Sequence, residues 1–370
     1  MDINWEIECD FRCEHGKYYQ FFVSDEVCKT SKGKVCINVY DCTFYANRLK
    51  NRKLHNYVIR EIRKNQCGFV GDNPAVCCPE IGSGIEMKMN EEPVDEITLN
   101  AKHKNLYLLP TEDCGMTTMQ FRVVHGDKAS LGEYPWMALI VYAMPDGLEF
   151  LCGGTLISKR YILTAAHCVV SNIMGVRLGE YNMLSNQDCD DTKSKCAPAV
   201  QDLLIESIHV HSEYSNRTNH NDIALMRLSR DADLSSEYVK PICLPIEDIP
   251  DVEGQLLTVV GWGLTETGGR SPVLKKAILP QVSLDKCRKL YEQRDTIVET
   301  QLCAGGHKED SCNGDSGGPL SLMVPLGRFS REVQFGIVSY GLKNCGTEGY
   351  PGVYTRVNNY VQWILDTIRP

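Results

Sequence analysis

The chain has 370 residues with 43% hydrophobic content, so it can bury a large core, and its length suggests two or three domains. Its formal net charge is −9, and its 18 cysteines are too many for a reducing cytosol unless they bind metal. The spacings of zinc-binding cysteines and histidines are absent, so disulfides, and therefore secretion, are expected in preference to a cytosolic protein.

The first segment, residues 1–27, shows no signal peptide, because residues 1–10 carry acids and lack both a basic start and an apolar run. Either the signal peptide was removed or the sequence begins after it. Cys9 and Cys13 lie here outside every cysteine pattern below, and a bridge between the two is one option. No stretch of the chain approaches the roughly 18 apolar residues of a membrane span. We expect neither a membrane span nor a nucleic-acid partner.

Six cysteines follow within residues 28–78: Cys28, Cys36, Cys42, Cys67, Cys77 and Cys78. This pattern resembles the clip domain, the disulfide module found ahead of arthropod serine proteases. The resemblance implies the pairs Cys28–Cys77, Cys36–Cys67 and Cys42–Cys78. The neighbours Cys77 and Cys78 point to different sides of an extended chain, which favours separate partners. So small a module needs disulfides because its apolar core is slight.

Residues 43–66 carry seven Lys or Arg against one acid, Glu61. They form either a solvated helical face or a contact with an acidic partner. Residues 79–122 are predicted to form a linker that ends in an activation site, because residues 80–113 are polar, acidic and without strong periodicity.

Residues 123–370 contain short apolar and β-branched runs broken by Gly and Pro, among them 136–142, 161–164, 256–262 and 335–340. Many short strands without βαβ spacing favour an all-β barrel or sandwich. The chain closes on a helical i, i+3, i+4, i+7 stripe, so a final helix should pack one face on the core. The stripe consists of Val361, Ile364, Leu365 and Ile368.

Three motifs carry the chemistry: residues 163–168 contain a histidine, 221–225 an aspartate and 310–319 a serine between glycines. With these motifs in this order, residues 123–370 resemble the chymotrypsin–trypsin family. The resemblance implies a mainly β domain, a pair of six-stranded β-barrels with the active site between them, preceded by the small disulfide-rich clip domain.

The same resemblance implies the catalytic roles. Ser316 would be the nucleophile, His167 the general base and then acid, and Asp222 the group that orients and charge-stabilises His167. A serine hydroxyl is a weak nucleophile at neutral pH, so an adjacent base is required. The N–H groups of Gly314 and Ser316 would form the oxyanion hole. The alternative for such a motif alone is a tight glycine turn and a core histidine.

Asp310 matches the family position at the base of the primary specificity pocket, where a buried carboxylate pairs with the cation of Lys or Arg. Gly341 and Gly352 match the two wall positions that stay small so that a long side chain can enter. The alternative for Asp310 is a surface aspartate. The family usually has Trp where Tyr340 stands, so substrate preferences beyond the primary pocket stay open.

Residues 121–126 resemble the family's activation site, where cleavage after Arg122 frees the N-terminus of Val123. The new ammonium would insert and pair with the carboxylate of Asp315, which organises the pocket and the oxyanion donors. His125 stands where relatives usually have Gly. The alternative is an exposed Arg in a linker.

The family also implies disulfides in this region, Cys152–Cys168, Cys287–Cys303 and Cys312–Cys345. It further implies an interchain bridge between Cys114 in the linker and Cys243. Cys189 and Cys196 then remain as a local bridge in an acidic insertion.

That insertion, residues 180–202, resembles the calcium loop of trypsin-like enzymes, with Glu180 at the first ligand position. Val200 occupies the site of the usual last acidic ligand, so one of several aspartates would complete the oxygen ligands of Ca²⁺. They are Asp188, Asp190, Asp191 and Asp202. A plain solvated acidic loop is the alternative. Asn216 heads an Asn-Arg-Thr triplet, the acceptor for N-glycosylation in a secreted chain.

The leading hypothesis is a secreted zymogen of a clip-domain serine endopeptidase in arthropod haemolymph. An upstream trypsin-like protease would activate it, and it would cleave a downstream protein zymogen or cytokine precursor after Arg or Lys, under control of a serpin inhibitor. Resemblance suggests innate immunity, through melanisation or Toll activation, or development. A non-catalytic clip homologue that acts as an adaptor would lack Ser316, and a digestive trypsin would need no clip module.

Overall fold

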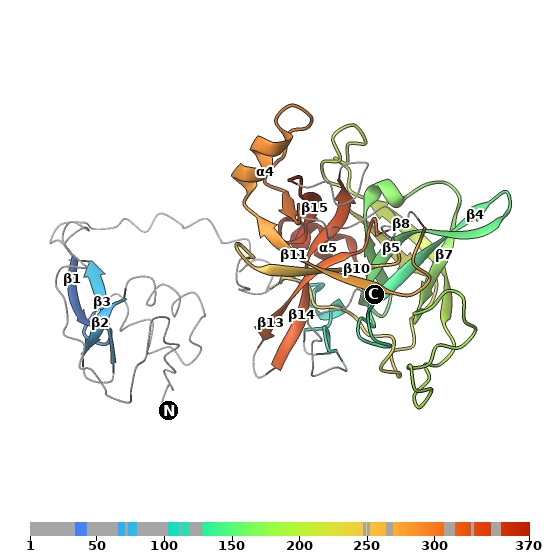
Figure 1. The fold of residues 1–370 in the computed structure, drawn as a ribbon, viewed down its shortest axis with the longest axis horizontal. Coiled ribbons are helices and arrows are strands. Elements are labelled where there is room, and N and C mark those ends of the chain that lie inside the picture. Colours follow the sequence, from blue (N-terminus) through green and yellow to red (C-terminus); the bar gives the residue numbers. More distant parts are fainter. Residues whose placement is uncertain are drawn as a thin grey trace. The chain divides into compact units, whose positions relative to one another are not determined.

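The computed structural model describes residues 34–42, 66–70, 73–79, 103–111, 113–117, 128–246, 249, 252–263, 269–306, 315–326, 329–341 and 349–370. The chain divides into two compact units, Met1–Asn90 and Glu91–Pro370 (Figure 1). Among the described residues, no helix has both the length and the apolar character needed to cross a membrane.

The first unit contains a three-stranded antiparallel sheet in the order β1 (Lys34–Asn38), β3 (Asn73–Pro79), β2 (Gln66–Val70). Its described core is small, and in it Val39 and Val76 pack against the disulfide Cys42–Cys78. The other two expected clip bridges, and the basic stretch up to residue 65, lie outside what the structure describes. A bridge at the centre of so few apolar side chains fits a module that depends on disulfides.

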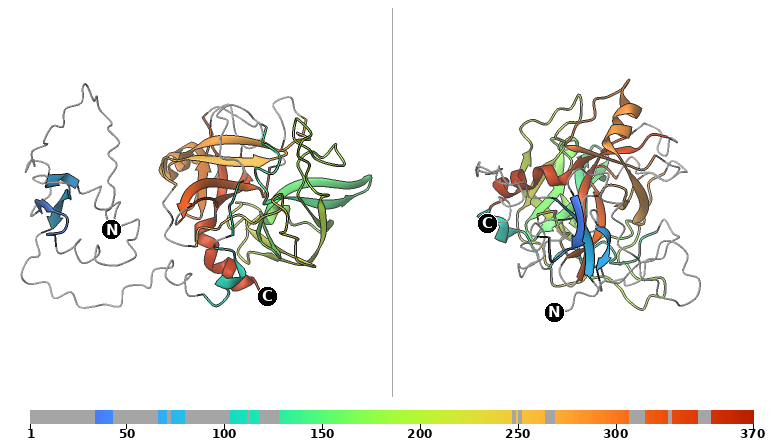
Figure 2. Two further views of the ribbon diagram at one scale, coloured as in Figure 1. Left: turned by 90° about the horizontal axis from the view of Figure 1, so that it is seen from below. Right: turned by 90° about the vertical axis from the view of Figure 1, so that its left-hand side faces the viewer.

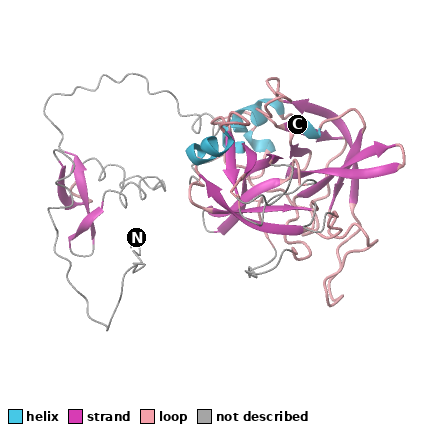
Figure 3. Cartoon of the chain, turned by 45° about the horizontal axis from the view of Figure 1, so that its top comes forward, coloured by secondary structure: helices cyan, strands magenta, loops and turns pink. Residues whose placement is uncertain are grey.

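The second unit consists mainly of two closed antiparallel barrels of six strands each, which confirms the predicted fold class. Strands dominate this unit in Figure 3. The first barrel is built from β4 (Met137–Met144), β5 (Gly147–Ser158), β6 (Tyr161–Thr164), β7 (Ile173–Leu178), β8 (Gln201–Val210) and β9 (Ala224–Leu228), closed in the order β4-β5-β6-β9-β8-β7.

The second barrel closes in the order β10-β11-β12-β15-β14-β13. Its strands are β10 (Leu256–Gly261), β11 (Lys275–Val282), β12 (Gln301–Ala304), β13 (Pro319–Leu326), β14 (Phe329–Tyr340) and β15 (Gly352–Arg356). Helix α4 (Leu284–Tyr291) connects β11 to β12. Closed barrels leave no unpaired strand edge, so these short apolar strands need no helix to cover an edge.

The last helix, α5 (Val361–Thr367), follows the 3₁₀ turn η3 (Val357–Tyr360). The four residues of the predicted stripe, Val361, Ile364, Leu365 and Ile368, are at most 1% exposed, which confirms the expected packing. Burial of side chains of this size stabilises the fold by about 1.5–3 kcal/mol each.

A stretch that precedes the barrels in sequence packs against α5 (Figure 2). It contains the 3₁₀ turn η1 (Leu106–Leu108), preceded by Asn105. The Asn105 amide donates hydrogen bonds to the backbone oxygens of Leu365 (2.8 Å) and Ile368 (2.9 Å). These bonds satisfy carbonyls at the end of α5 that have no partner within the helix.

Farther along, Cys114 forms a disulfide with Cys243. Next to it Gly115, with φ of +60°, donates its N–H to the Pro241 oxygen and accepts the Glu332 N–H, each at 2.9 Å. A Cβ on Gly115 would lie 2.2 Å from the Glu332 oxygen, so only glycine fits this contact. Residues 103–111 and 113–117 therefore belong structurally to the second unit.

Candidate active site

His167 and Asp222 lie next to each other at the neighbouring ends of two paired strands of the first barrel. His167 lies in the 3₁₀ turn η2 (Ala166–Cys168) after β6, and Asp222 lies just before β9, the strand that pairs with β6. The His167 backbone N–H donates to Asp222 Oδ1 at 2.9 Å, and His167 Nδ1 lies 2.7 Å from Asp222 Oδ2. The Asp222 side chain is fully buried, whereas that of His167 is 28% exposed. This geometry fixes the imidazole and leaves Nε2 for proton transfer.

Two residues of the second barrel also hold Asp222. Ser339 of β14 donates its hydroxyl to Asp222 Oδ2 at 2.5 Å, and Thr355 of β15 donates its hydroxyl to the Asp222 backbone oxygen at 2.7 Å. A buried carboxylate needs such donors, because burial without hydrogen bonds costs several kcal/mol. Sequence reasoning missed both roles. Ser339 lies directly before the predicted pocket residues, but a serine at a strand end is too common to signal this contact.

Ser316 lies in the turn that leads into β13, and backbone contacts join this turn to the first barrel. The Ser316 oxygen accepts the Gly153 N–H of β5 at 2.8 Å. The next residue, Gly317, has φ of +79°, and a Cβ there would lie 2.2 Å from the Thr164 hydroxyl and 3.2 Å from Cys168 Sγ. Thr164 ends the strand before the His167 turn and Cys168 is the last residue of that turn, so the fold brings Ser316 and His167 to one region. Gly314 lies outside the described residues.

Asp315 is seated against two glycines that flank Trp262. Its Oδ1 accepts the Gly263 N–H at 2.8 Å. A Cβ on Gly261 would lie 2.0 Å from the same oxygen, so any residue larger than glycine at position 261 would clash with the carboxylate. The two residues predicted for the activation switch, Arg122 and Val123, lie outside the described residues, so their pairing with Asp315 stays a prediction.

The pocket residues are described in part. A Cβ on Gly341 would lie 4.0 Å from the Gly352 Cα, so the ends of β14 and β15 approach each other where both glycines stand. Larger residues here would narrow the space between the two segments. Asp310, Cys312 and Cys345 lie outside the described residues. The other bridges expected in this unit are present, Cys152–Cys168, Cys189–Cys196 and Cys287–Cys303.

One group of side chains in the described part of the chain meets the spacing of a metal site, Cys152, His167 and Cys168. Cys152 and Cys168 are joined by a disulfide, so they offer no thiolate to a metal. The group is therefore part of the site around His167 and does not hold a metal of its own.

In the acidic loop, the carboxylates of Glu180 and Asp188 are almost completely buried and close enough to repel each other. Burial first, and then the charge of Asp188, raise the pKa of Glu180, while Arg177 opposes the rise. Arg177 Nη1 lies 3.3 Å from Glu180 Oε2, and the same guanidinium binds both oxygens of Asp202, at 2.8 and 2.9 Å. An internal cation thus compensates two of the acids of this loop.

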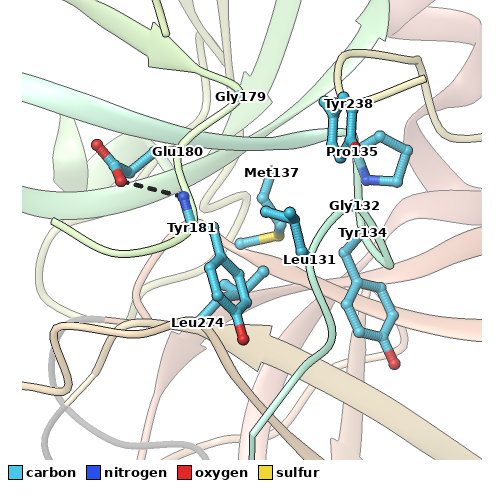
Figure 4. A pocket seen from close by; sticks show the side chains of 10 residues that line it. All are labelled: Leu131, Gly132, Tyr134, Pro135, Met137, Gly179, Glu180, Tyr181, Tyr238 and Leu274. Carbon is cyan, nitrogen blue, oxygen red and sulfur yellow. Dashed lines mark hydrogen bonds between the residues drawn. The ribbon is translucent and has the colours of Figure 1, made fainter. Parts of the chain in front are cut away.

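The two buried carboxylates of the loop accept hydrogen bonds from protein donors. The Glu180 carboxylate accepts the Tyr181 N–H at 3.0 Å and points away from Met137 and Leu131 of the adjoining pocket (Figure 4). The Asp188 carboxylate accepts the N–H groups of Tyr181 (2.9 Å) and Asn182 (3.1 Å) and the hydroxyl of Ser185.

The remaining acids have other partners, since Asp190 binds Ser194 within its own turn and Asp191 pairs with Lys128. The carboxylates that the resemblance implied as calcium ligands thus have protein partners, and a bound Ca²⁺ stays a prediction.

Comparisons with known proteins agree with this geometry. The family model described as Trypsin matches residues 123–364, and that described as Regulatory CLIP domain of proteinases matches residues 28–78. Phenoloxidase-activating factor 3 of Holotrichia diomphalia is 38% identical, over 94% of this chain and 95% of that protein. Serine protease grass of Drosophila melanogaster is 40% identical, over 83% of this chain and 80% of the relative.

A solved structure is similar throughout most of the chain. It is titled "Crystal structure of drosophila Grass clip serine protease of Toll pathway", with a TM-score of 0.62 and 36% identity, and covers 90% of this chain and 94% of its own. The chain belongs to the trypsin family of serine proteases and, within it, to the clip-domain serine proteases.

Proposed function

We propose that the chain is a secreted zymogen that becomes an endopeptidase through the triad of His167, Asp222 and Ser316. The observation that carries the proposal is the buried Asp222 carboxylate, which binds both the backbone N–H and Nδ1 of His167. A carboxylate in this place sets the imidazole tautomer and stabilises the imidazolium that forms during the reaction. Trypsin-family proteases need no catalytic cofactor.

In the proposed reaction, the Ser316 hydroxyl attacks the scissile carbonyl carbon while its proton passes to His167 Nε2. The peptide C–N bond then breaks, and His167 gives that proton to the leaving amine. Water repeats the two steps on the acyl-enzyme and restores Ser316. The N–H groups of Gly314 and Ser316 would stabilise the oxyanion, where one donor is worth about 2.7–4 kcal/mol.

We assign the preference for Arg or Lys to Asp310, with entry to the pocket past Gly341 and Gly352. Both positions lack a side chain, which supports a pocket that leaves room for a long side chain. A buried carboxylate at its base attracts a cation and offers nothing to an apolar side chain.

Activation is assigned to cleavage after Arg122 by an upstream trypsin-like protease, with the new Val123 ammonium pairing with Asp315. The Asp315 carboxylate is held close to Gly261 and Gly263, and this fixed position supports its role as the partner of the new ammonium. The names of the relatives support an extracellular cascade of the melanisation or Toll type, acting on a downstream zymogen or cytokine precursor and controlled by a serpin. Asn216, exposed between β8 and β9, is the proposed glycan site.

Peptide profiling tests the proposal. The activated protein should cleave peptides with Arg or Lys before the scissile bond and leave matched Phe and Leu peptides intact. Equal turnover of the Phe peptides would contradict the role of Asp310, and failure to cleave any of them would contradict the proposed activity.

A further inference from the structure

The residue directly before Asp222 has an uncommon backbone conformation. Asn221 has φ of +54°, which lies in the left-handed region that few residues other than glycine adopt. Asparagine tolerates this region better than most residues, because its short polar side chain can form local hydrogen bonds. A strained turn of this kind persists only where neighbouring groups hold it, and such turns are concentrated at active sites.

The Asn221 side chain is held at both ends of its amide. Its Oδ1 accepts the Tyr360 hydroxyl at 2.7 Å, and its Nδ2 donates to the Glu213 backbone oxygen at 2.9 Å. Glu213 lies in the loop after β8, whereas Tyr360 ends the 3₁₀ turn η3 before α5. The Asn221 backbone oxygen also accepts the Ile223 N–H at 2.8 Å. Two segments far apart in the sequence therefore hold this turn in place.

Tyr360 is packed so that its hydroxyl has a fixed position. The residue is only 3% exposed, and its ring meets that of His211 edge to face, with centroids 5.4 Å apart and an interplanar angle of 84°. Burial raises the pKa of Tyr360, and the nearby charge of Asp222 adds to the rise, so the hydroxyl remains a donor at neutral pH. A buried hydroxyl needs an acceptor, and the Asn221 amide oxygen provides it.

The backbone of Asp222 is anchored on its other side as well. The Asp222 backbone oxygen accepts the Thr355 hydroxyl at 2.7 Å, and Thr355 lies in β15, which runs directly into the turn that ends at Tyr360. The C-terminal part of the chain thus holds the backbone before and after this aspartate. Because His167 Nδ1 lies 2.7 Å from Asp222 Oδ2, even a small displacement of that backbone lengthens the hydrogen bond between them.

We infer that Asn221 and Tyr360 are positioning residues for Asp222, because together they hold the backbone turn that directs its carboxylate toward His167. The inference rests on the proposed function. Without the hydrogen bond between them, the turn can leave its left-handed conformation, and the carboxylate then faces Nδ1 for only part of the time. The rate of the chemical step falls in proportion to that time. Substrate binding does not depend on this turn, so KM stays the same.

The test uses the activated full chain and an Arg peptide. Tyr360→Phe keeps the buried ring and removes only the hydroxyl, whereas Asn221→Gly keeps the left-handed backbone and removes the amide. We expect kcat to fall about two- to tenfold in each variant, with KM unchanged. The double variant should be no worse than Asn221→Gly, which already lacks the acceptor. Asn219→Gly is the matched control, because Asn219 has nearly the same φ, +50°, but does not adjoin Asp222.

Proton NMR gives a second readout that does not depend on turnover. The proton between His167 Nδ1 and the Asp222 carboxylate gives a downfield resonance, which should shift or broaden in Tyr360→Phe and Asn221→Gly and stay in place in Asn219→Gly. An unchanged kcat and resonance, a loss confined to KM, or an equal loss in Asn219→Gly would overturn the inference. If the parent enzyme cleaves no Arg peptide, the proposed function fails, and the resonance still decides the inference.

Discussion

Ser339 donates its hydroxyl hydrogen bond to Asp222 Oδ2, the same oxygen that faces His167 Nδ1. The catalytic carboxylate is thus shared between a histidine on the first barrel and a serine on the second. Each barrel alone would leave this buried charge short of donors. The contact therefore couples the docking of the two barrels to the state of the proposed triad.

Replacing Ser339 by Ala should reduce activity without abolishing folding. Loss of a hydrogen bond to a buried charged group costs about 1.5 kcal/mol or more, which is roughly a tenfold fall in kcat/KM. Steady-state kinetics on an Arg peptide measures the fall, and Ser339→Thr, which keeps the hydroxyl, is the control. An Ala variant with unchanged kcat/KM would show that Ser339 does not support Asp222.

The apolar and β-branched runs are local signals and predicted short strands in a barrel or sandwich, and the two six-stranded barrels were implied by the resemblance to the trypsin family. The same resemblance, carried by three motifs in order, identified His167, Asp222 and Ser316 as candidates. The role of Ser339 could not be predicted, because it depends on how β14 of the second barrel approaches a residue of the first. The hydrogen bond from the Tyr340 hydroxyl to the Asp295 carboxylate likewise depends on the position of the turn after α4.

The acidic loop shows why a charge pattern is weaker evidence than a motif. The sequence displays its acids but not the register of β7 and β8, which places Arg177 opposite Asp202. Through that register one guanidinium reaches both Asp202 and Glu180. A one-residue shift would turn Arg177 to the other face of the sheet and leave the acids uncompensated.

Replacing Arg177 by Met should lower thermal stability, most strongly at neutral pH and above. The pKa of Glu180 is raised in the folded protein, so stability falls as pH rises through the range between its unfolded and folded pKa values. Because Arg177 opposes that rise, the variant should extend the fall to higher pH. The difference in Tm between parent and variant should thus be larger at pH 8 than near pH 4, measured by scanning calorimetry.

Calcium provides the matching test of the same loop. If Arg177 is the cation that compensates these acids, added Ca²⁺ or a chelator should leave the Tm of the parent protein unchanged. The Arg177→Met variant serves as the comparison under both conditions. A Tm of the parent that rises with Ca²⁺ would contradict this account and restore the calcium site that the sequence pattern indicated.

Cleavage after Arg122 should leave the two fragments joined through Cys114–Cys243. When the N-terminal fragment stays joined, the clip domain that it carries remains at high effective concentration near the enzyme. The cut protein should run as one species on a non-reducing denaturing gel and as two after reduction, the larger beginning Val-Val-His-Gly. The Cys114→Ser variant should separate without reductant. A parent protein that also separates would contradict the bridge, and another N-terminus would contradict the activation site.

The central claim is that Ser316 is the nucleophile of an Arg- or Lys-directed endopeptidase, and covalent labelling tests it most directly. The activated chain is treated with a fluorophosphonate, digested and examined by mass spectrometry, with Ser316→Ala and His167→Ala as comparisons. We predict one adduct, on Ser316, with labelling slowed strongly in His167→Ala and absent in Ser316→Ala, whose kcat/KM falls by about 10⁴-fold or more. An adduct on another residue, or full activity in Ser316→Ala, would contradict the account.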